Sequence, residues 1–217
     1  MLRQERAVLG EVLPTVFGFY LLQAGVWGPT PELLQSSRIR TRVVLDVDAP
    51  DVSLRADPAY LPFASDSVDA VVLPHTLERT NDPHQLLREA ERVLTGEGRL
   101  IVLGFHPWGP WGMGGQLGFR SPWSGAHIRA GRLQEWLSVL GFEILGIRHY
   151  LYRPPLPHDV LLVKSRFLDN WRWRLTAGAY MLAARKRVFC LTPLRQQLAR
   201  PKRAFAGVVK PTTREMG

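Results

Sequence analysis

Cysteine is almost missing from this chain of 217 residues, since Cys190 is the single one, and this excludes a disulfide framework or a metal site built from several cysteines. The six histidines are scattered without the spacing of metal ligands. No secretory signal is recognisable at the start, which is charged and helical in pattern. The apolar run at 12–22 contains Pro14 and is too short to span a bilayer. These absences predict a cytoplasmic protein that needs no metal.

Acidic residues are nearly missing from the last quarter of the chain. Residues 164–217 hold 13 Lys and Arg but only two acidic residues, whereas residues 1–163 hold 15 basic and 17 acidic residues. The whole net charge of +9 therefore comes from one end. From residue 193 the chain has little apolar periodicity, which predicts a domain at 1–192 and a flexible basic tail at 193–217. Such a tail suits RNA or an anionic membrane surface, or serves only solubility.

The middle of the chain has the pattern of a strand, a helix and a second strand. Residues 68–73 form a nearly continuous apolar run rich in β-branched side chains, typical of a strand buried on both faces. Asp82 and Pro83 are residue types that begin helices, and apolar residues then follow at helical spacing. Residues 99–103 form the next apolar run. Together they predict a βαβ crossover, and so an α/β fold with helices on both faces of a mostly parallel sheet.

The other expected elements frame this unit. We expect strands at 16–22, 42–47, 52–55, 141–145 and 178–187 and a helix at 132–140. Gly96 and Gly98 are expected to end the helix that begins at Pro83, because glycine readily takes the left-handed conformation of a helix end.

The stretch from Asp57 to Phe105 resembles the second half of the cofactor domain of class I S-adenosylmethionine-dependent methyltransferases, in the type 11 subgroup. The motifs that carry the resemblance are Leu61-Pro62-Phe63, Ser67-Val68-Asp69 and Arg92-Val93-Leu94, which fall at the family's spacing. The resemblance implies a Rossmann-like fold with an antiparallel last strand. It also implies methyl transfer from S-adenosylmethionine.

By this resemblance, the strand at 16–22 leads into the donor loop. The family has an acidic residue two positions before a glycine, followed by further glycines, so that the backbone can approach the methionine part of the cofactor. Here Gln23 replaces the acid and Trp27 replaces a glycine, while Gly25 and Gly28 remain. We expect all four residues to contact the cofactor, with the Trp ring either blocking the pocket or lying on the sulfonium. The alternative is a plain turn without a ligand.

Three aspartates are expected to hold the adenosine half of the cofactor. The strand at 42–47 ends at Asp46 and Asp48, where an acid would bind the ribose hydroxyls, or the two residues form a solvated turn. By the resemblance, Asp57 accepts from the adenine amino group, although Asp57-Pro58 also suits the start of a turn. Only eleven positions separate Asp46 from Asp57, so the helix usual between them in the family must be missing or reduced.

Two histidines follow expected strands at the edge where parallel sheets bind ligands. By the resemblance, His75 borders the methionine moiety, and a neutral histidine there could also act as a general base. The alternative is that it only caps the loop. His106 has the same two interpretations.

Two tryptophan-rich segments complete the pattern. Residues 107–115 contain Trp108 and Trp111, which with Trp123 predict an acceptor pocket or lid, or else a loop packed by its own aromatic side chains. Residues 167–175 alternate Trp and Arg, which suits RNA or a membrane surface, or a helix packed on the sheet.

We therefore expect a methyltransferase that uses S-adenosylmethionine and a small or medium-sized acceptor. The alternative is a non-catalytic member of the fold that binds a partner or RNA through its basic last quarter. Binding of the methyl donor distinguishes the two, because fold alone does not fix chemistry.

Overall fold

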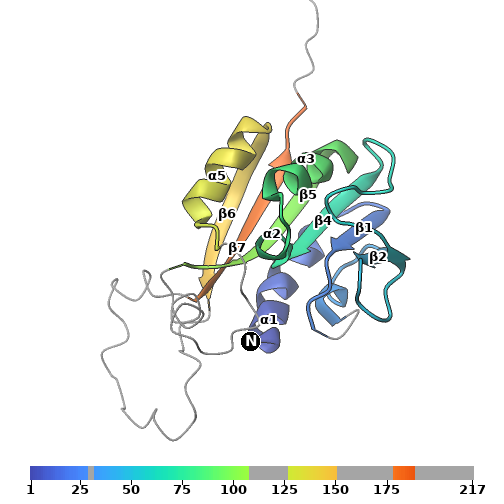
Figure 1. Cartoon of the computed structure of the whole chain (residues 1–217), viewed down its shortest axis with the longest axis horizontal. Helices are drawn as coiled ribbons and strands as arrows, with labels where there is room; N and C mark the ends of the chain where they lie inside the picture. The colour runs from blue at the N-terminus through green and yellow to red at the C-terminus, as the bar shows by residue number, and fades with distance from the viewer. Residues whose placement is uncertain (29–31, 108–126, 151–177, 189–217) are drawn as a thin grey trace, which may run out of the picture.

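The computed structural model describes residues 1–28, 32–107, 127–150 and 178–188 (Figure 1). Its strands are β1 (Tyr20–Ala24), β2 (Thr41–Asp46), β3 (Leu54–Arg55), β4 (Val68–Pro74), β5 (Leu94–Phe105), β6 (Phe142–Tyr150) and β7 (Ala179–Lys186). Its helices are α1 (Leu2–Val12), α2 (Thr76–Arg79), α3 (Pro83–Val93) and α5 (Ala130–Val139), with 3₁₀ turns η1 (Leu13–Thr15) and η2 (Glu32–Leu34).

The strands form one sheet in the order β3-β2-β1-β4-β5-β7-β6. Strands β1 to β5 pair in parallel, and β7 is antiparallel to both of its neighbours, β5 and β6. The predicted α/β fold with an antiparallel last strand is therefore confirmed. Residues 47–53, between β2 and β3, contain no helix, as the short spacing in the sequence predicted. The chain order reverses beside β1, and such a switch point is where open α/β sheets bind ligands.

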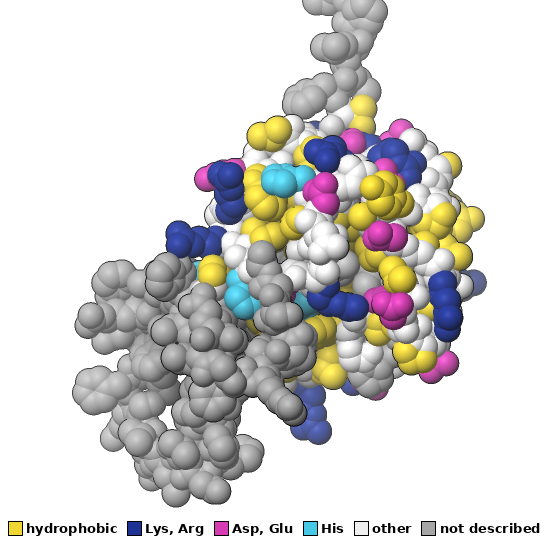
Figure 2. All heavy atoms as spheres, in the orientation of Figure 1, with side chains coloured by type: hydrophobic (Ala, Val, Ile, Leu, Met, Phe, Trp, Pro, Cys, Tyr) yellow, Lys and Arg dark blue, Asp and Glu magenta, His cyan; other side chains and the backbone are white. Residues whose placement is uncertain are grey.

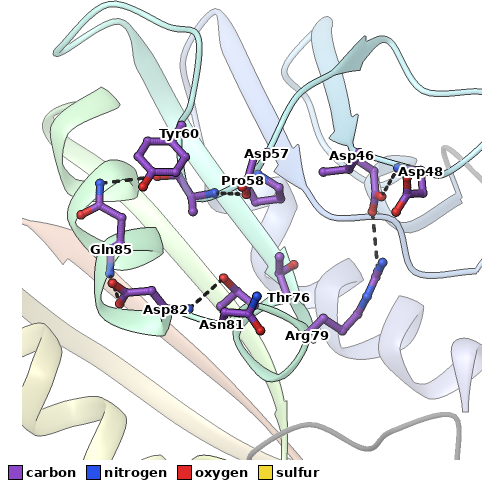
Figure 3. A pocket seen from close by; sticks show the side chains of 13 residues that line it. Asp46, Asp48, Asp57, Pro58, Tyr60, Thr76, Arg79, Asn81, Asp82 and Gln85 are labelled. Carbon is purple, nitrogen blue, oxygen red and sulfur yellow. Dashed lines mark hydrogen bonds and ion pairs between the residues drawn. The ribbon is translucent and has the colours of Figure 1, made fainter.

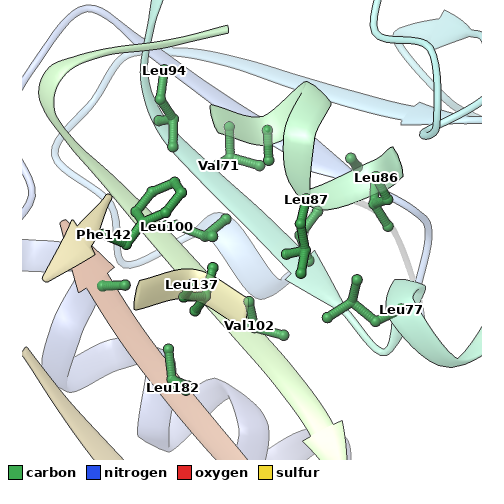
Figure 4. Close-up of a cluster of buried hydrophobic side chains, with 14 of the residues drawn as sticks. Val71, Leu77, Leu86, Leu87, Leu94, Leu100, Val102, Leu137, Phe142 and Leu182 are labelled. Atoms are coloured by element: carbon green, nitrogen blue, oxygen red, sulfur yellow. The ribbon is translucent and has the colours of Figure 1, made fainter. Parts of the chain in front are cut away.

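Each face of the sheet buries its own apolar cluster. Along β4, Val71 and Leu73 pack on the side of α3 and α5, whereas Ala70 and Val72 face α1. This alternation is what the period of two in a strand requires, and it explains why the run in the sequence is continuously apolar. Figure 4 shows the first cluster, where leucines of α3 and α5 meet side chains of β4, β5, β7 and β6.

The strand expected at 16–22 begins later, at Tyr20. The Asp69 carboxylate accepts hydrogen bonds from the backbone N–H groups of Phe19 and Tyr20, at 2.7 and 2.9 Å. Gly18 has φ +147°, and a Cβ there would lie 2.3 Å from Asp69. The chain therefore enters the sheet through a close turn over Asp69 instead of an extended strand.

The expectation that Gly96 and Gly98 end α3 in left-handed conformations is wrong. The chain leaves the helix at Leu94, which is extended, and the residue with positive φ in the following turn is Glu97. Leu94 is fully buried and pairs with Val68 as the first residue of β5. Burial of this leucine in the sheet thus ends the helix before the glycines are reached.

Several expectations concern residues outside the described part of the chain. One is the basic tail at 193–217, together with the domain boundary before it. The others are the acceptor pocket expected at Trp108, Trp111 and Trp123, and the Trp/Arg segment at 167–175. Among the described helices, none is long and apolar enough to cross a membrane.

Candidate functional site

A cavity of about 410 Å³ lies at the ligand-binding edge of the sheet (Figure 3). Its walls come from the ends of β2 and β3, from α2 and from the start of α3. The lining residues are Asp46, Val47, Asp48, Asp57, Pro58, Ala59, Tyr60, Thr76, Arg79, Thr80, Asn81, Asp82 and Gln85. Four of them are aspartates and one is an arginine, so the cavity favours a ligand with cationic groups or hydrogen-bond donors.

Asp46 anchors the loop that follows β1. Its Oδ2 accepts from the Val26 N–H at 2.7 Å, and its Oδ1 accepts from the Asp48 N–H at 3.2 Å. Burial raises the pKa of this carboxyl, but these backbone hydrogen bonds and the Arg79 charge outweigh burial and lower the pKa below its usual value. Asp46 therefore stays ionised at neutral pH, and its negative charge serves the loop as well as the cavity.

Arg79 was not identified from the sequence. Its Nη1 lies 3.6 Å from Asp46 Oδ2 (Figure 3) and donates to the Val26 carbonyl at 2.9 Å. Helix α2 is therefore tied to both the end of β2 and the loop after β1. The position of Arg79 in the sequence could have identified it, because it comes six residues after the apolar run at 68–73. Residues that follow a parallel strand this closely lie at the ligand-binding edge of the sheet.

Asp57 lines the same cavity and also starts a turn. Its Oδ1 accepts from the Ala59 N–H at 2.8 Å. Asp48 is exposed and lines the cavity as well. The structure thus brings three of the predicted cofactor residues together, Asp46, Asp48 and Asp57. Their contacts with adenine and ribose remain predictions.

The expected donor loop lies beside the cavity without lining it. Gln23 is 2% exposed, and its Nε2 donates to the Gly25 carbonyl at 3.0 Å, while its Oε1 is buried without a hydrogen-bond partner in the described structure. Gly25 has φ +95°, and a Cβ there would lie 2.3 Å from Thr76 Oγ1. Gly28 has φ +74° and packs as closely on Leu2. Both glycines are needed for the loop's conformation.

Trp27 and His75 belong to a buried polar cluster, which we define by Glu5, Trp27, His75 and Glu78. Trp27 Nε1 donates to Glu5 Oε2 at 2.6 Å, and the His75 ring nitrogens lie 3.0 Å from Glu5 Oε1 and 3.3 Å from Glu78 Oε2. The Trp27 and His75 ring centroids are 4.4 Å apart. These two residues do not line the cavity, and their expected contact with the cofactor stays a prediction.

The pKa of His75 reflects its two carboxylate partners. Burial lowers the pKa of the imidazole, but the hydrogen bonds and charges of Glu5 and Glu78 outweigh burial and raise the pKa above 6.5. The raised pKa means that the folded protein binds the proton more tightly than the unfolded chain does. This contribution to stability is complete below pH 6.5 and is lost as the pH rises through the higher pKa of the folded state.

We expect the stability difference between the wild type and His75→Asn to narrow as the pH rises above 6.5. Asparagine tolerates the left-handed conformation of this residue, φ +55°, but cannot take up the proton. Urea unfolding at several pH values from 5.5 to 9 measures the difference. His84→Asn, at an exposed histidine, is the matched control. A difference for His75→Asn that does not vary with pH contradicts this role of the imidazole.

Metal ligands are not grouped in the described residues: no three His, Cys, Asp or Glu side chains there are placed to hold an ion. His106 lies apart from the first cavity and lines a second one.

Comparison with known proteins agrees with this geometry. A family profile described as a methyltransferase domain matches residues 29–102. The uncharacterized protein YafS of Escherichia coli is 32% identical over 193 residues, which cover 86% of this chain and 77% of YafS.

Solved structures share the fold at lower identity. An S-adenosylmethionine-dependent methyltransferase of Archaeoglobus fulgidus superposes with a TM-score of 0.64 at 16% identity, over 85% of this chain and 94% of that one. The putative methyltransferase in a Haloferax volcanii complex with the activator Trm112 superposes with a TM-score of 0.63 at 17% identity, over 85% of this chain and 90% of that one. From these comparisons, the chain belongs to the same family as YafS, and it has the fold of class I S-adenosylmethionine-dependent methyltransferases, with a methyltransferase-domain match over residues 29–102.

Proposed function

We propose that this protein transfers the methyl group of S-adenosylmethionine to a small or medium-sized acceptor. The observation that carries the proposal is the acidic cavity beside the switch point of the sheet. Its aspartates suit a donor that bears a sulfonium, an ammonium, an adenine amino group and two ribose hydroxyls. A cytoplasmic location stays a prediction.

The residues present fit this cofactor. We assign Asp57 to the adenine amino group and Asp48 to the ribose hydroxyls; this assignment is supported by the position of both residues in the lining of one cavity, together with the ionised Asp46. The buried Oε1 of Gln23 lacks a partner in the described part and suits the ammonium of the methionine part. Gly25 allows the backbone a close approach that a side chain would prevent.

Methyl transfer asks the protein mainly for positioning. S-adenosylmethionine supplies an electrophilic methyl carbon, which the acceptor attacks in line with the departing thioether. The side chains of the cavity would hold the donor in that orientation and exclude water from it. His75 has both ring nitrogens near carboxylates, so we assign it to the support of the loop and not to the role of general base.

We expect S-adenosylmethionine to bind the wild type and to bind Asp57→Asn more weakly by about 1.5–3 kcal/mol, the usual value of a hydrogen bond to a charged group. Asparagine can still accept from the Ala59 N–H, so the turn is retained while the charge is lost. Isothermal titration calorimetry with the donor and with S-adenosylhomocysteine measures both affinities.

Asp51→Asn is the matched control, because Asp51 is exposed, lies outside the cavity lining and has a left-handed φ of +57° that asparagine tolerates. Absence of binding to the wild type at millimolar donor refutes the proposed function. Equal affinities of the wild type and Asp57→Asn refute only the assignment of Asp57.

A non-catalytic role is the second candidate, favoured by the charge of residues 164–217, which carry 13 basic and two acidic residues. Such a protein would bind RNA, a partner or an anionic membrane through salt-dependent contacts. It would have no need of the methyl donor, so the same titration separates the two functions.

A further inference from the structure

A second cavity, of about 830 Å³, opens between the ends of β5 and β6 and the start of α5. Its lining residues are His106, His127, Ile128, Arg129, Ala130, Gly131, Arg132, Gln134, Glu135, Trp136, Ile147 and His149. We call it the His/Arg cavity. Because β7 is antiparallel to both β5 and β6, these two strands run in the same direction. Their ends therefore lie at the same edge of the sheet as the donor cavity.

Basic groups dominate the His/Arg cavity. Among its described lining residues are three histidines and two arginines but one acid, Glu135, which pairs with Arg132 at 2.9 Å on the surface. The pKa of His106 is lowered by burial and by the nearby His149 and Arg129, as a positive local field requires. In Figure 2, histidine and basic side chains gather where the described part of this face borders the grey residues.

The backbone adds to the same field. Helix α5 begins inside the cavity wall, with Arg129 as its N-cap, no side-chain cap and no acidic residue in its first turn. Its first N–H groups carry the positive end of the helix dipole. In addition, Nδ1 of His127 is shielded from solvent and has no hydrogen-bond partner in the described structure. A buried polar atom of this kind usually has a partner, which a ligand can supply.

Apart from Gln134, the other described side chains that line the cavity are apolar. Ile128 is buried and Ile147 half-buried, and the Trp136 ring centroid lies 5.7 Å from the Arg132 guanidinium carbon and 3.9 Å from the His84 ring centroid. These side chains offer a surface for the carbon skeleton of a ligand, and the basic groups offer one for its charge.

Aromatic rings connect this cavity to the buried polar cluster beside the donor loop. His75 follows β4, and Phe105 ends the adjacent strand β5. The rings of these two residues stack with centroids 4.1 Å apart. Phe105 in turn lies 6.0 Å from the ring of His127. The His/Arg cavity and the donor loop are therefore connected through a short chain of ring contacts along the same edge of the sheet.

We propose that the His/Arg cavity binds the methyl acceptor and that this acceptor carries an anionic group, a phosphate or a carboxylate, on an apolar or aromatic body. The anionic group would lie against Arg129 and the start of α5, and the body against Ile128, Ile147 and Trp136. This inference rests on the proposed function, because it assigns the second substrate of the same reaction.

Three naphthalene compounds with the same ring test the inference by calorimetric titration of the whole protein: 1-naphthyl phosphate, 1-naphthoate and 1-naphthylmethylamine. We expect at least one of the two anions to bind and the amine not to bind. The anion that binds more tightly identifies the anionic group of the acceptor as a phosphate or a carboxylate. Arg129→Gln should weaken binding of the anion about tenfold, as expected for the loss of one charge-assisted contact. Arg129 is exposed, so this variant should fold.

Arg40→Gln is the matched control, since Arg40 is exposed directly before β2, at the opposite edge of the sheet. Binding of the amine as tight as that of the anions, or an Arg129→Gln affinity equal to that of the wild type, overturns the inference. Titration of S-adenosylmethionine on the same samples separates the failures. Donor binding without anion binding overturns this inference alone, and anion binding without donor binding overturns the proposed function.

Discussion

Replacing Glu5 with alanine should lower the free energy of unfolding by about 3–5 kcal/mol, the usual cost of removing one partner from a buried charged network. Glu5 is 0% exposed. Its two oxygens bind Trp27 Nε1 and the imidazole of His75. Alanine would leave both of these groups without this acceptor in the interior, and it would also detach α1 from the donor loop.

Urea denaturation at pH 7 measures this effect. Glu32→Ala is the matched control, because Glu32 pairs with Arg6 where both side chains are well exposed, and such surface pairs contribute at most about 1 kcal/mol. Glu5→Gln should fall between the two, since an amide oxygen can still accept from Trp27. A loss for Glu5→Ala no larger than that for Glu32→Ala would show that the buried cluster does not hold the fold together.

Gly25→Ala should destabilise the fold by about 2–5 kcal/mol, from backbone strain together with overpacking, and weaken donor binding at least about tenfold. Gly25 has φ +95°, and its added Cβ would lie 2.3 Å from Thr76 Oγ1 and 2.9 Å from Thr76 Cγ2. Thr76 cannot easily move, because its hydroxyl donates to the Ala24 carbonyl at 2.5 Å. The loop must therefore shift, and with it the backbone that would face the methionine part.

A second variant separates the two causes. Gly25→Ala with Thr76→Ala removes most of the clash but keeps the positive φ, so stability should recover in part. Gly131→Ala, in the first turn of α5 with nothing within 4 Å of its added Cβ, should change stability by no more than about 0.5 kcal/mol. Thermal unfolding and donor titration measure both effects. Gly25→Ala with unchanged stability and donor affinity would contradict the assigned role of this glycine.

Local patterns predicted most of the fold. The run at 68–73 became β4, and Asp82 caps α3 by accepting from the Gln85 N–H at 2.9 Å. Both features depend on neighbours a few residues apart. The early start expected for β1 and the glycine end expected for α3 were wrong because tertiary contacts decide them: Asp69 for the first and the buried Leu94 for the second.

Residues of the candidate site could be predicted from the sequence only where they lie at or just after the carboxyl end of a strand. Asp46, Asp48 and Asp57 follow short strands and line one cavity. The contacts of Trp27 and His75 with Glu5 span 22 and 70 positions, and no local pattern in the sequence announces them. The acceptor side was expected among tryptophans outside the described residues, whereas the His/Arg cavity is formed by residues that are distant in the sequence.

The position of β7 between β5 and β6 has a consequence for synthesis of the chain on the ribosome. In the described sheet, both neighbours form their backbone hydrogen bonds with β7 and not with each other. While residues 179–186 are still untranslated, β5 and β6 each present an edge with free N–H and C=O groups, the kind of edge that recruits foreign strands. The described sheet is thus complete only once β7 lies between β5 and β6, and until then these two edges are open to pairing with other strands.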